Sequence, residues 1–198
     1  MELNLDDYFP EKYFCSLKEA SIDTANDIYL VNNGFKVMKI DDYNKSCYQK
    51  EMNHFNCLRG GDACFVRNNK IYIIEFKNTY LNQRIVYEIL EKMYDSCIVL
   101  MDKLNISISD FKTNVNFVTV YTFKENCEEI NLYDEIDKIQ NRGMNKIKNA
   151  VARRSTKKIK EIDKKAFGLK KLEKYIYSEV SAIPVDYFQK YLQEENII

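Results

Sequence analysis

Two carboxylates and a lysine are spaced so that a single β-hairpin would gather them on one face. Asn68-Asn69 separates two apolar runs and suits a two-residue turn, because asparagine tolerates positive φ better than other residues that carry a side chain. The register that this loop sets puts Asp62 directly opposite Glu75. Lys77 shares the face of Glu75, because strand side chains alternate with period two. We therefore expect Asp62, Glu75 and Lys77 to form one cluster.

Such a cluster suits metal-assisted hydrolysis. Facing carboxylates destabilise a sheet by roughly 0.2–1 kcal/mol, and by more where burial lowers the dielectric, so a bound cation would relieve the repulsion. Mg²⁺ or Mn²⁺ prefers carboxylate oxygens, and it can activate a water and offset the charge of a phosphodiester transition state. Lys77 could orient or deprotonate that water. The alternative is a Glu75–Lys77 pair with a structural role only, although the apolar strand around it does not suit an exposed edge.

The elements that must hold this hairpin alternate between helix and strand. Apolar spacing predicts a helix from 11 to about 33, ended by Gly34, and then a strand at 35–40. Residues 41–58 are mixed, and their later part fits either a second strand or an irregular approach to Gly60. A helix capped by Asn78 or Thr79 should follow the strands at 62–67 and 70–77 and run to about 101. A strand is expected at 115–123.

The last third of the chain has a helical pattern and an uneven charge. Helices are predicted at about 129–152, 156–178 and 184–195, the last with Pro184 in its first turn. Residues 138–174 contain fourteen basic and three acidic residues, a net charge of +11, so the rest of this neutral chain carries −11. A basic stretch beside an acidic remainder fits a polyanionic partner, although a solvated helix face is the usual interpretation of such a run.

Three motifs resemble those of the PD-(D/E)XK nuclease superfamily, and most closely its RecB-like branch. They are Gly60-Gly61-Asp62, Glu75-x-Lys77 and Gln83-x-x-x-Tyr87, and the resemblance covers about residues 11–123, with Gly61 in place of the usual proline. It implies an α/β fold of the α+β type, with a restriction-endonuclease-like core whose central mixed sheet is flanked by helices. We expect this core at 1–127 and a basic helical C-terminal extension at 128–198.

The resemblance also implies roles for individual residues. Asp62 and Glu75 would hold one or two Mg²⁺ or Mn²⁺ ions, with Lys77 aiding water activation. Many members carry a further acid on the first helix, for which Glu19 is the candidate, with Asp23 one turn further on, and some use a histidine, for which the candidate is His54. The residues expected to contact nucleic acid are Gln83, Arg84, Tyr87, Arg153, Arg154, Lys157 and Lys158.

Two functions are consistent with these residues. The first is a divalent-metal-dependent nuclease, with DNA favoured over RNA. The second is a catalytically inactive nuclease-like module that binds nucleic acid or a protein partner. The small size suggests a homodimer or a partner subunit.

Composition excludes several other classes. Hydrophobic residues make up 45% and charged residues 30% of 198, as in ordinary globular proteins. The six cysteines are scattered without a Cys-x-x-Cys pair, which disfavours zinc and iron–sulfur sites. No apolar run is long enough for a membrane span, and the acidic start is unlike a signal peptide. We therefore expect a cytoplasmic protein with no membrane partner.

Overall fold

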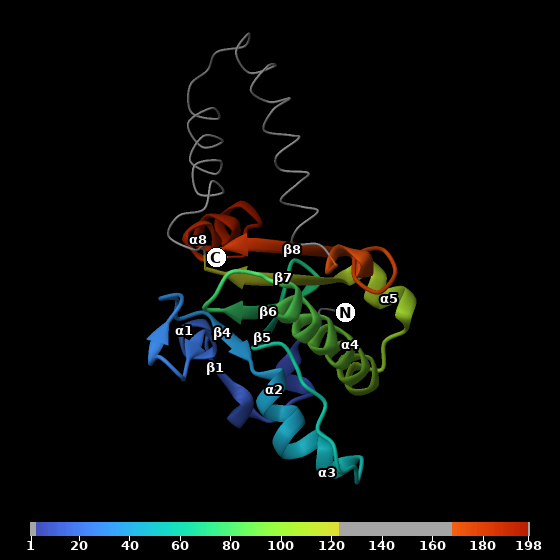
Figure 1. The fold of residues 1–198 in the computed structure, drawn as a ribbon. Helices are drawn as coiled ribbons and strands as arrows, with labels where there is room; N and C mark the ends of the chain where they lie inside the picture. The colour runs from blue at the N-terminus through green and yellow to red at the C-terminus, as the bar shows by residue number, and fades with distance from the viewer. Residues whose placement is uncertain (1–2, 123–167, 198) are drawn as a thin grey trace.

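A mixed six-stranded sheet forms the centre of the structure, a computed structural model that describes residues 3–122 and 168–197. The strand order is β1-β4-β5-β6-β7-β8, antiparallel from β1 to β6 and parallel from β6 to β8 (Figure 1). The strands are β1 (Phe14–Ser16), β4 (Lys36–Met38), β5 (Ala63–Arg67), β6 (Lys70–Lys77), β7 (Val115–Tyr121) and β8 (Glu179–Pro184). Short strands β2 (Ile22–Asp23) and β3 (Ile28–Tyr29) form a separate ribbon. The expected α+β architecture with a central mixed sheet flanked by helices is confirmed.

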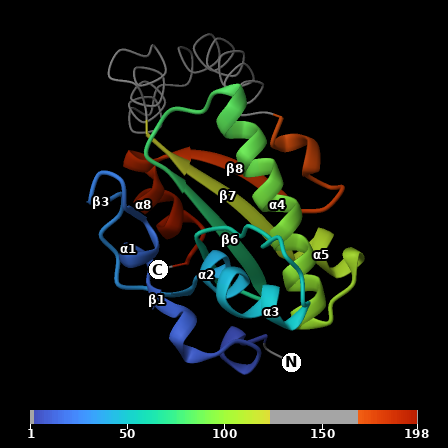
Figure 2. The same cartoon turned by 60° about the horizontal axis from the view of Figure 1, so that its bottom comes forward.

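Helices cover both faces of the sheet (Figure 2). One face carries α2 (Ile40–Tyr43), the long α4 (Gln83–Leu104) and α5 (Ile108–Asn114). A π-helical segment (Asn44–Tyr48) joins α2 to α3 (Gln49–Glu51). The other face carries α1 (Leu17–Ala20) and α8 (Val185–Glu194). Single-turn 3₁₀ helices lie at Leu5–Asp7, Glu11–Tyr13 and Lys170–Leu172.

The β5–β6 hairpin has the register that its turn predicts. Asn68 and Asn69 both have positive φ, 51° and 59°, as the favoured two-residue hairpin turn requires. Arg67 pairs with Lys70, and the pairing continues to Ala63 opposite Ile74. The next residues in this register are Asp62 and Glu75, so the turn at one end of the hairpin aligns the two acids at the other.

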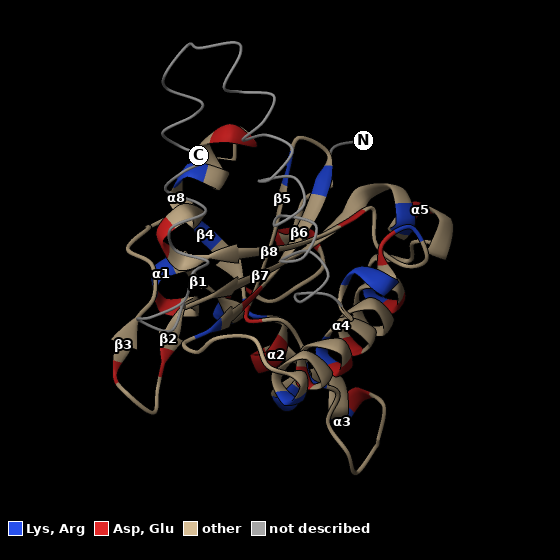
Figure 3. Cartoon of the chain, turned by 45° about the horizontal axis from the view of Figure 1, so that its top comes forward, with Lys and Arg blue, Asp and Glu red and all other residues tan. Residues whose placement is uncertain are grey.

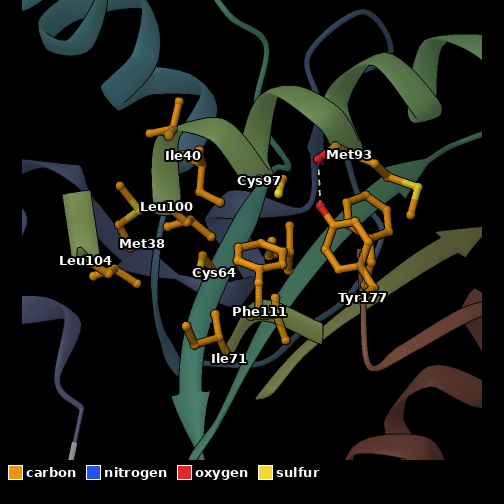
Figure 4. Close-up of a cluster of buried hydrophobic side chains, with 14 of the residues drawn as sticks. Met38, Ile40, Cys64, Ile71, Met93, Cys97, Leu100, Leu104, Phe111 and Tyr177 are labelled. Carbon is orange, nitrogen blue, oxygen red and sulfur yellow. Dashed lines mark hydrogen bonds between the residues drawn. The ribbon is translucent and has the colours of Figure 1, made fainter. Parts of the chain in front are cut away.

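Strand β6 is buried on both sides because the two helical layers pack against it. Ile71 and Ile73 contribute to the core under α4, whereas Tyr72, Ile74 and Phe76 contribute to the core under α8. Figure 4 shows the α4 side, where Cys64, Cys97 and Leu100 pack together and the Tyr177 hydroxyl donates to the Met93 carbonyl at 2.6 Å. Glu75 lies on this α4 side, two residues beyond Ile73.

The C-terminal region differs from the prediction of a purely helical extension. Strand β8 pairs in parallel with β7 inside the core sheet, so residues 179–184 belong to the core. The helix predicted at 156–178 is wrong over 168–178, where a 3₁₀ turn is followed by a bridge between Glu173 and Tyr177. The Tyr177 ring is fully buried against Phe111 and Phe117, and this packing favours the turn over a helix. The final helix is confirmed as α8, with Pro184 at its N-cap. The helix predicted at 129–152 and the first part of the next one lie outside the described residues.

The long helix predicted near the N-terminus is also wrong. Residues 14–16 form strand β1 paired with β4, and the following helix α1 has only four residues. Ser16 starts α1 through a capping box with Glu19. Non-local strand pairing has overridden a local apolar pattern that also fits a helix. Residues 41–51 are helical, and the later part of 41–58 is the irregular approach to Gly60.

Helix α4 begins later and ends later than predicted. Asn82 caps it by accepting from the Ile85 amide at 3.0 Å, and Asn105 ends it in the left-handed conformation. Asn78 instead donates to Asp23 at 2.8 Å. Helix α5, which had no counterpart in the sequence prediction, lies between α4 and β7 and has its own capping box at Ser107.

The glycine pair before Asp62 allows two elements to approach closely. A Cβ atom on Gly61 would lie 2.6 Å from the Ile73 Cγ2 atom, and one on Gly60 would lie 2.5 Å from the Ile40 Cγ2 atom. Real Cβ atoms do not approach other atoms so closely, so either substitution forces the backbone or its neighbours to move.

We predict that Gly61→Ala lowers the melting temperature by roughly 2–10 °C, because overpacking a core costs about 1–3 kcal/mol. Gly34→Ala is the matched control, since a Cβ there meets nothing within 4 Å. Thermal unfolding followed by circular dichroism measures both. Equal melting temperatures for the two variants would contradict the close approach at Gly61.

Candidate active site

Asp62 and Glu75 converge on one lysine that the sequence argument did not identify. The Lys92 ammonium, from α4, lies 3.0 Å from Asp62 Oδ1 and 2.8 Å from Glu75 Oε2. The Lys92 side chain is only 8% exposed and the Glu75 side chain is fully buried. The repulsion expected between the two acids is therefore offset by a cation that belongs to the chain.

Lys77 approaches the same carboxylate from the other side. Its ammonium lies 2.9 Å from Glu75 Oε1, and its side chain is 16% exposed. This contact is an ion pair outside hydrogen-bond geometry, so Glu75 Oε1 is buried without a hydrogen-bond donor. The predicted grouping of Asp62, Glu75 and Lys77 is thus observed, and each Glu75 oxygen faces one lysine ammonium.

Charges of alternating sign continue from this cluster to the surface of α4. The Lys77 ammonium lies 4.0 Å from Glu88 Oε2, and Arg84 Nε donates to Glu88 Oε1 at 3.2 Å. Figure 3 shows acidic and basic residues along α4. Asp62, Lys92, Glu75, Lys77, Glu88 and Arg84 form an uninterrupted series in which every charge has an opposite neighbour.

Helix α4 also holds the backbone that leads into Asp62. The Arg59 amide donates to Asp95 Oδ2 at 2.8 Å, and the Gly61 amide donates to Ser96 Oγ at 3.0 Å. Asp62 itself accepts from the Phe76 amide at 2.7 Å, which closes the hairpin end. Lys92, Asp95 and Ser96 lie within two turns of one helix, so α4 sets the position of the acidic pair.

The cluster lies at the bottom of a pocket of about 480 Å³. Its wall includes Asp23 and Asn78, which are hydrogen-bonded to each other, and Asp41, which accepts from the Gly60 amide at 3.2 Å. The charged residues that line the pocket are five acids and four lysines: Asp23, Asp41, Asp42, Asp62, Glu75, Lys39, Lys45, Lys77 and Lys92. The pocket therefore offers both cationic and anionic groups to a ligand.

Burial changes the acidity of the central groups. Desolvation, reinforced by the Asp62 charge, raises the pKa of Glu75 from 4.5 to about 7 against the opposing effect of Lys92 and Lys77. Desolvation alone would lower the pKa of Lys92, but the charges of Asp62 and Glu75 outweigh it and raise that pKa. Lys92 therefore remains charged wherever Glu75 titrates.

The two candidates for a third metal ligand lie elsewhere. Glu19 Oε2 accepts from the Ser16 amide at 2.8 Å and does not line the pocket. His54 lies in an exposed loop, where its ring contacts the Asn56 backbone. Glu19 closes the cap of α1 and the His54 ring contacts the Asn56 backbone, and neither side chain is among the residues that line the pocket. Asp23, named with Glu19, does reach the pocket.

Gln83, Arg84 and Tyr87 lie together on the exposed start of α4. Gln83 Nε2 is 3.5 Å from the Tyr87 hydroxyl, as expected for residues one turn apart. With Glu88 and Glu91 they line a separate, open surface hollow. Glu88 connects that hollow to Lys77. The four basic candidates Arg153, Arg154, Lys157 and Lys158 lie outside the described residues.

Asp62 and Glu75 suit an ion that keeps much of its bound water, such as Mg²⁺, better than an ion whose ligands all come from protein side chains. Among residues 3–122 and 168–197, no three His, Cys, Asp or Glu side chains converge as a ligand set. Asp62 and Glu75 provide two carboxylates that converge on one point, which the Lys92 ammonium occupies in this structure. Mg²⁺ usually keeps several waters and takes only one or two carboxylates, so Asp62 and Glu75 could serve as its ligands if the Lys92 ammonium moved away from them.

Comparison with protein-family models, curated proteins and solved structures finds no match to this chain. Its function must therefore be argued from the site. Within the described ranges, none of the helices combines the length and the apolar character needed to cross a lipid bilayer.

We predict that Glu75 makes folding stability decrease as pH rises. A carboxyl whose pKa is raised from 4.5 to about 7 binds a proton more tightly in the folded state. Its contribution is fully present below 4.5 and is lost as pH rises through 7, an effect on the order of 1–3 kcal/mol. In EDTA, the melting temperature of wild type minus that of Glu75→Gln should fall between pH 5 and pH 8.

Glu51→Gln is the matched control, since Glu51 pairs with Lys103 and the pKa of Glu51 is lowered, first by that hydrogen bond. The stabilising effect of the Glu51 ion pair is lost only when pH falls below the ordinary pKa of a glutamate, so it stays constant between pH 5 and pH 8. If the melting temperature of wild type minus that of Glu75→Gln stays level or rises with pH, the pKa of Glu75 is not raised in the folded protein.

Proposed function

We propose that this protein is a divalent-metal-dependent nuclease that hydrolyses phosphodiester bonds. The observation that carries the proposal is Glu75, a fully buried carboxylate at the bottom of a charged pocket, with Asp62 and Lys77 on the same face. A buried charged group is expensive unless function or pairing retains it. The burial of Glu75 beside the partly exposed Asp62 and Lys77, all three of which line the pocket, supports a catalytic role.

Asp62 and Glu75 would hold Mg²⁺ or Mn²⁺ through the two oxygens that bond the Lys92 ammonium in this structure. When bound, such an ion supplies an activated water and charge stabilisation for the departing oxygen. Lys77, beside Glu75 and partly open to the pocket, would orient the attacking water and donate to a phosphate oxygen as negative charge develops. Each residue thus has a role that its position allows.

The substrate and the fold family are further parts of this proposal. The observed order of the hairpin, the helix α4 and the parallel strand β7 is compatible with a restriction-endonuclease-like core. The motifs resemble the RecB-like branch of the PD-(D/E)XK superfamily, in which DNA is the commoner substrate, so DNA is favoured over RNA. Gln83, Arg84 and Tyr87 would contact the phosphates beside the pocket, and action as a homodimer or with a partner subunit remains part of the proposal.

A catalytically inactive nuclease-like module is the second candidate, and Lys92 favours it. Asp62, Glu75, Lys77 and Lys92 sum to zero charge, so the cluster is balanced without any metal ion. Such a module would bind nucleic acid or a protein partner through the same surface. Activity in the presence of metal separates the two functions.

The decisive measurement is cleavage of single- and double-stranded DNA and RNA in Mg²⁺, Mn²⁺ or EDTA. We expect cleavage in metal only, and a loss of roughly 10²-fold or more in Asp62→Asn, Glu75→Gln and Lys77→Met, because each removes a group that acts on the reacting phosphate or its metal. Glu51→Gln, which removes an ion-paired glutamate outside the pocket, should retain full activity. Cleavage that persists in EDTA or in Glu75→Gln would overturn the nuclease assignment.

The basic segment provides a separate prediction about binding. Replacing Arg153, Arg154, Lys157 and Lys158 by Gln should weaken nucleic-acid binding and flatten its salt dependence, because each phosphate contact adds about 0.7–0.9 to the slope of log K against log salt. Fluorescence anisotropy across a salt series measures this slope. Replacing the exposed Lys12, Lys18 and Lys50 is the control. An unchanged slope in the first variant would exclude these residues as phosphate contacts.

A further inference from the structure

Lys92 holds the place in this site that a metal ion would need. Its ammonium lies within 3.0 Å of an oxygen from each acid, and it comes from α4, outside the hairpin that carries the three motif residues. Two carboxylates and one ammonium at these distances leave no room for a second cation bonded to the same two oxygens. Lys92 and a divalent ion must therefore compete for that position.

We infer that Lys92 is an internal counter-ion that stabilises the metal-free site and is displaced from the acidic pair when a divalent cation binds. The inference rests on the metal site of the proposed function. It assigns Lys92 a positioning role, since the residue holds Asp62 and Glu75 in place before metal arrives and lowers the affinity of the site for metal.

Acidic side chains surround Lys92 both where it lies in the metal-free site and where it would move when a divalent ion binds. In the metal-free state the buried lysine has two acids as partners, which offsets the cost of burying its charge. Asp41 lines the same pocket. Desolvation would raise the pKa of Asp41, but its bonds to Lys45 and to the Gly60 amide, together with the charge of Lys92, lower it, so Lys92 and Asp41 lie within electrostatic range. Asp41, which already pairs with Lys45, is the acid toward which the displaced ammonium would move.

The test compares wild type with Lys92→Met, Lys92→Gln and Lys92→Arg. Binding of Mn²⁺ alone is followed by the electron paramagnetic resonance signal of the free ion. Loss of the competing charge should tighten Mn²⁺ binding by about tenfold or more in Lys92→Met and Lys92→Gln, because like charges a few ångströms apart repel strongly. Lys92→Arg keeps the charge and should not gain affinity. Lys103→Met, on the same helix but paired with Glu51, should bind Mn²⁺ as wild type does.

Thermal stability provides the second readout. In EDTA, Lys92→Met should melt roughly 6–15 °C below wild type, because it leaves two acids without their shared cation. Lys92→Gln can still donate to Glu75, so its melting temperature should fall less. Mn²⁺ binding can therefore be compared in this variant even if Lys92→Met does not fold. Saturating Mn²⁺ should raise the melting temperature of both neutral variants more than that of wild type.

The outcomes distinguish this inference from the proposed function. If wild type cleaves nucleic acid and binds Mn²⁺ at least as tightly as Lys92→Gln does, Lys92 does not compete with the metal ion. The nuclease assignment would then remain intact. If wild type does not cleave nucleic acid but Lys92→Met and Lys92→Gln bind Mn²⁺ more tightly than wild type, Lys92 does compete with the metal ion. The nuclease assignment would then be wrong.

Discussion

The burial of Glu75 between two lysines is the interaction on which the rest of the structure depends. A carboxylate with no exposed surface is tolerated only when opposite charges and hydrogen bonds replace its water. Lys77 supplies one charge from the same strand, and Lys92 supplies the other from α4. Because Lys92 also bonds Asp62, one ammonium joins both arms of the hairpin, at the end away from its turn, to the helix that covers them. The packing of α4 on the sheet and the charge balance of the pocket therefore depend on the same contacts of Lys92.

This constraint explains why the approach to Asp62 is so tightly specified. The same two turns of α4 receive the amides of Arg59 and Gly61, and the close contact with Ile73 leaves space only for glycine. A shift of α4 would move the backbone that carries Asp62 and the ammonium that balances it together. The position of the acids is thus determined by helix-on-sheet packing as much as by the hairpin.

The sequence predicted what depends on local rules. The Asn68-Asn69 turn and the alternation of β6 were sufficient to bring Asp62, Glu75 and Lys77 to one face. Pairings between distant segments were missed: β8 beside β7, β1 in place of a long helix, and above all Lys92. A signal for Lys92 was present, because it falls at helical spacing between the buried residues Ile89 and Ser96. A lysine on the apolar stripe of a helix requires an acidic partner, and the hairpin offers the buried Glu75 and the partly buried Asp62.

The use of a lysine at position 92 has a further physical consequence. Its ammonium is a compact charge on a flexible stem with three donors, so it can bond two carboxylates at once and can also withdraw along its own side chain. An arginine would spread the same charge over a rigid planar fork, which suits bidentate pairing with one carboxylate and moves less readily. Glu75 Oε1 accepts no hydrogen bond and faces the Lys77 ammonium, so this side of the carboxylate is balanced by charge alone. A cluster whose acids are balanced by two lysines of the same chain can fold without a divalent cation, and by the inference above it admits one when the Lys92 ammonium withdraws.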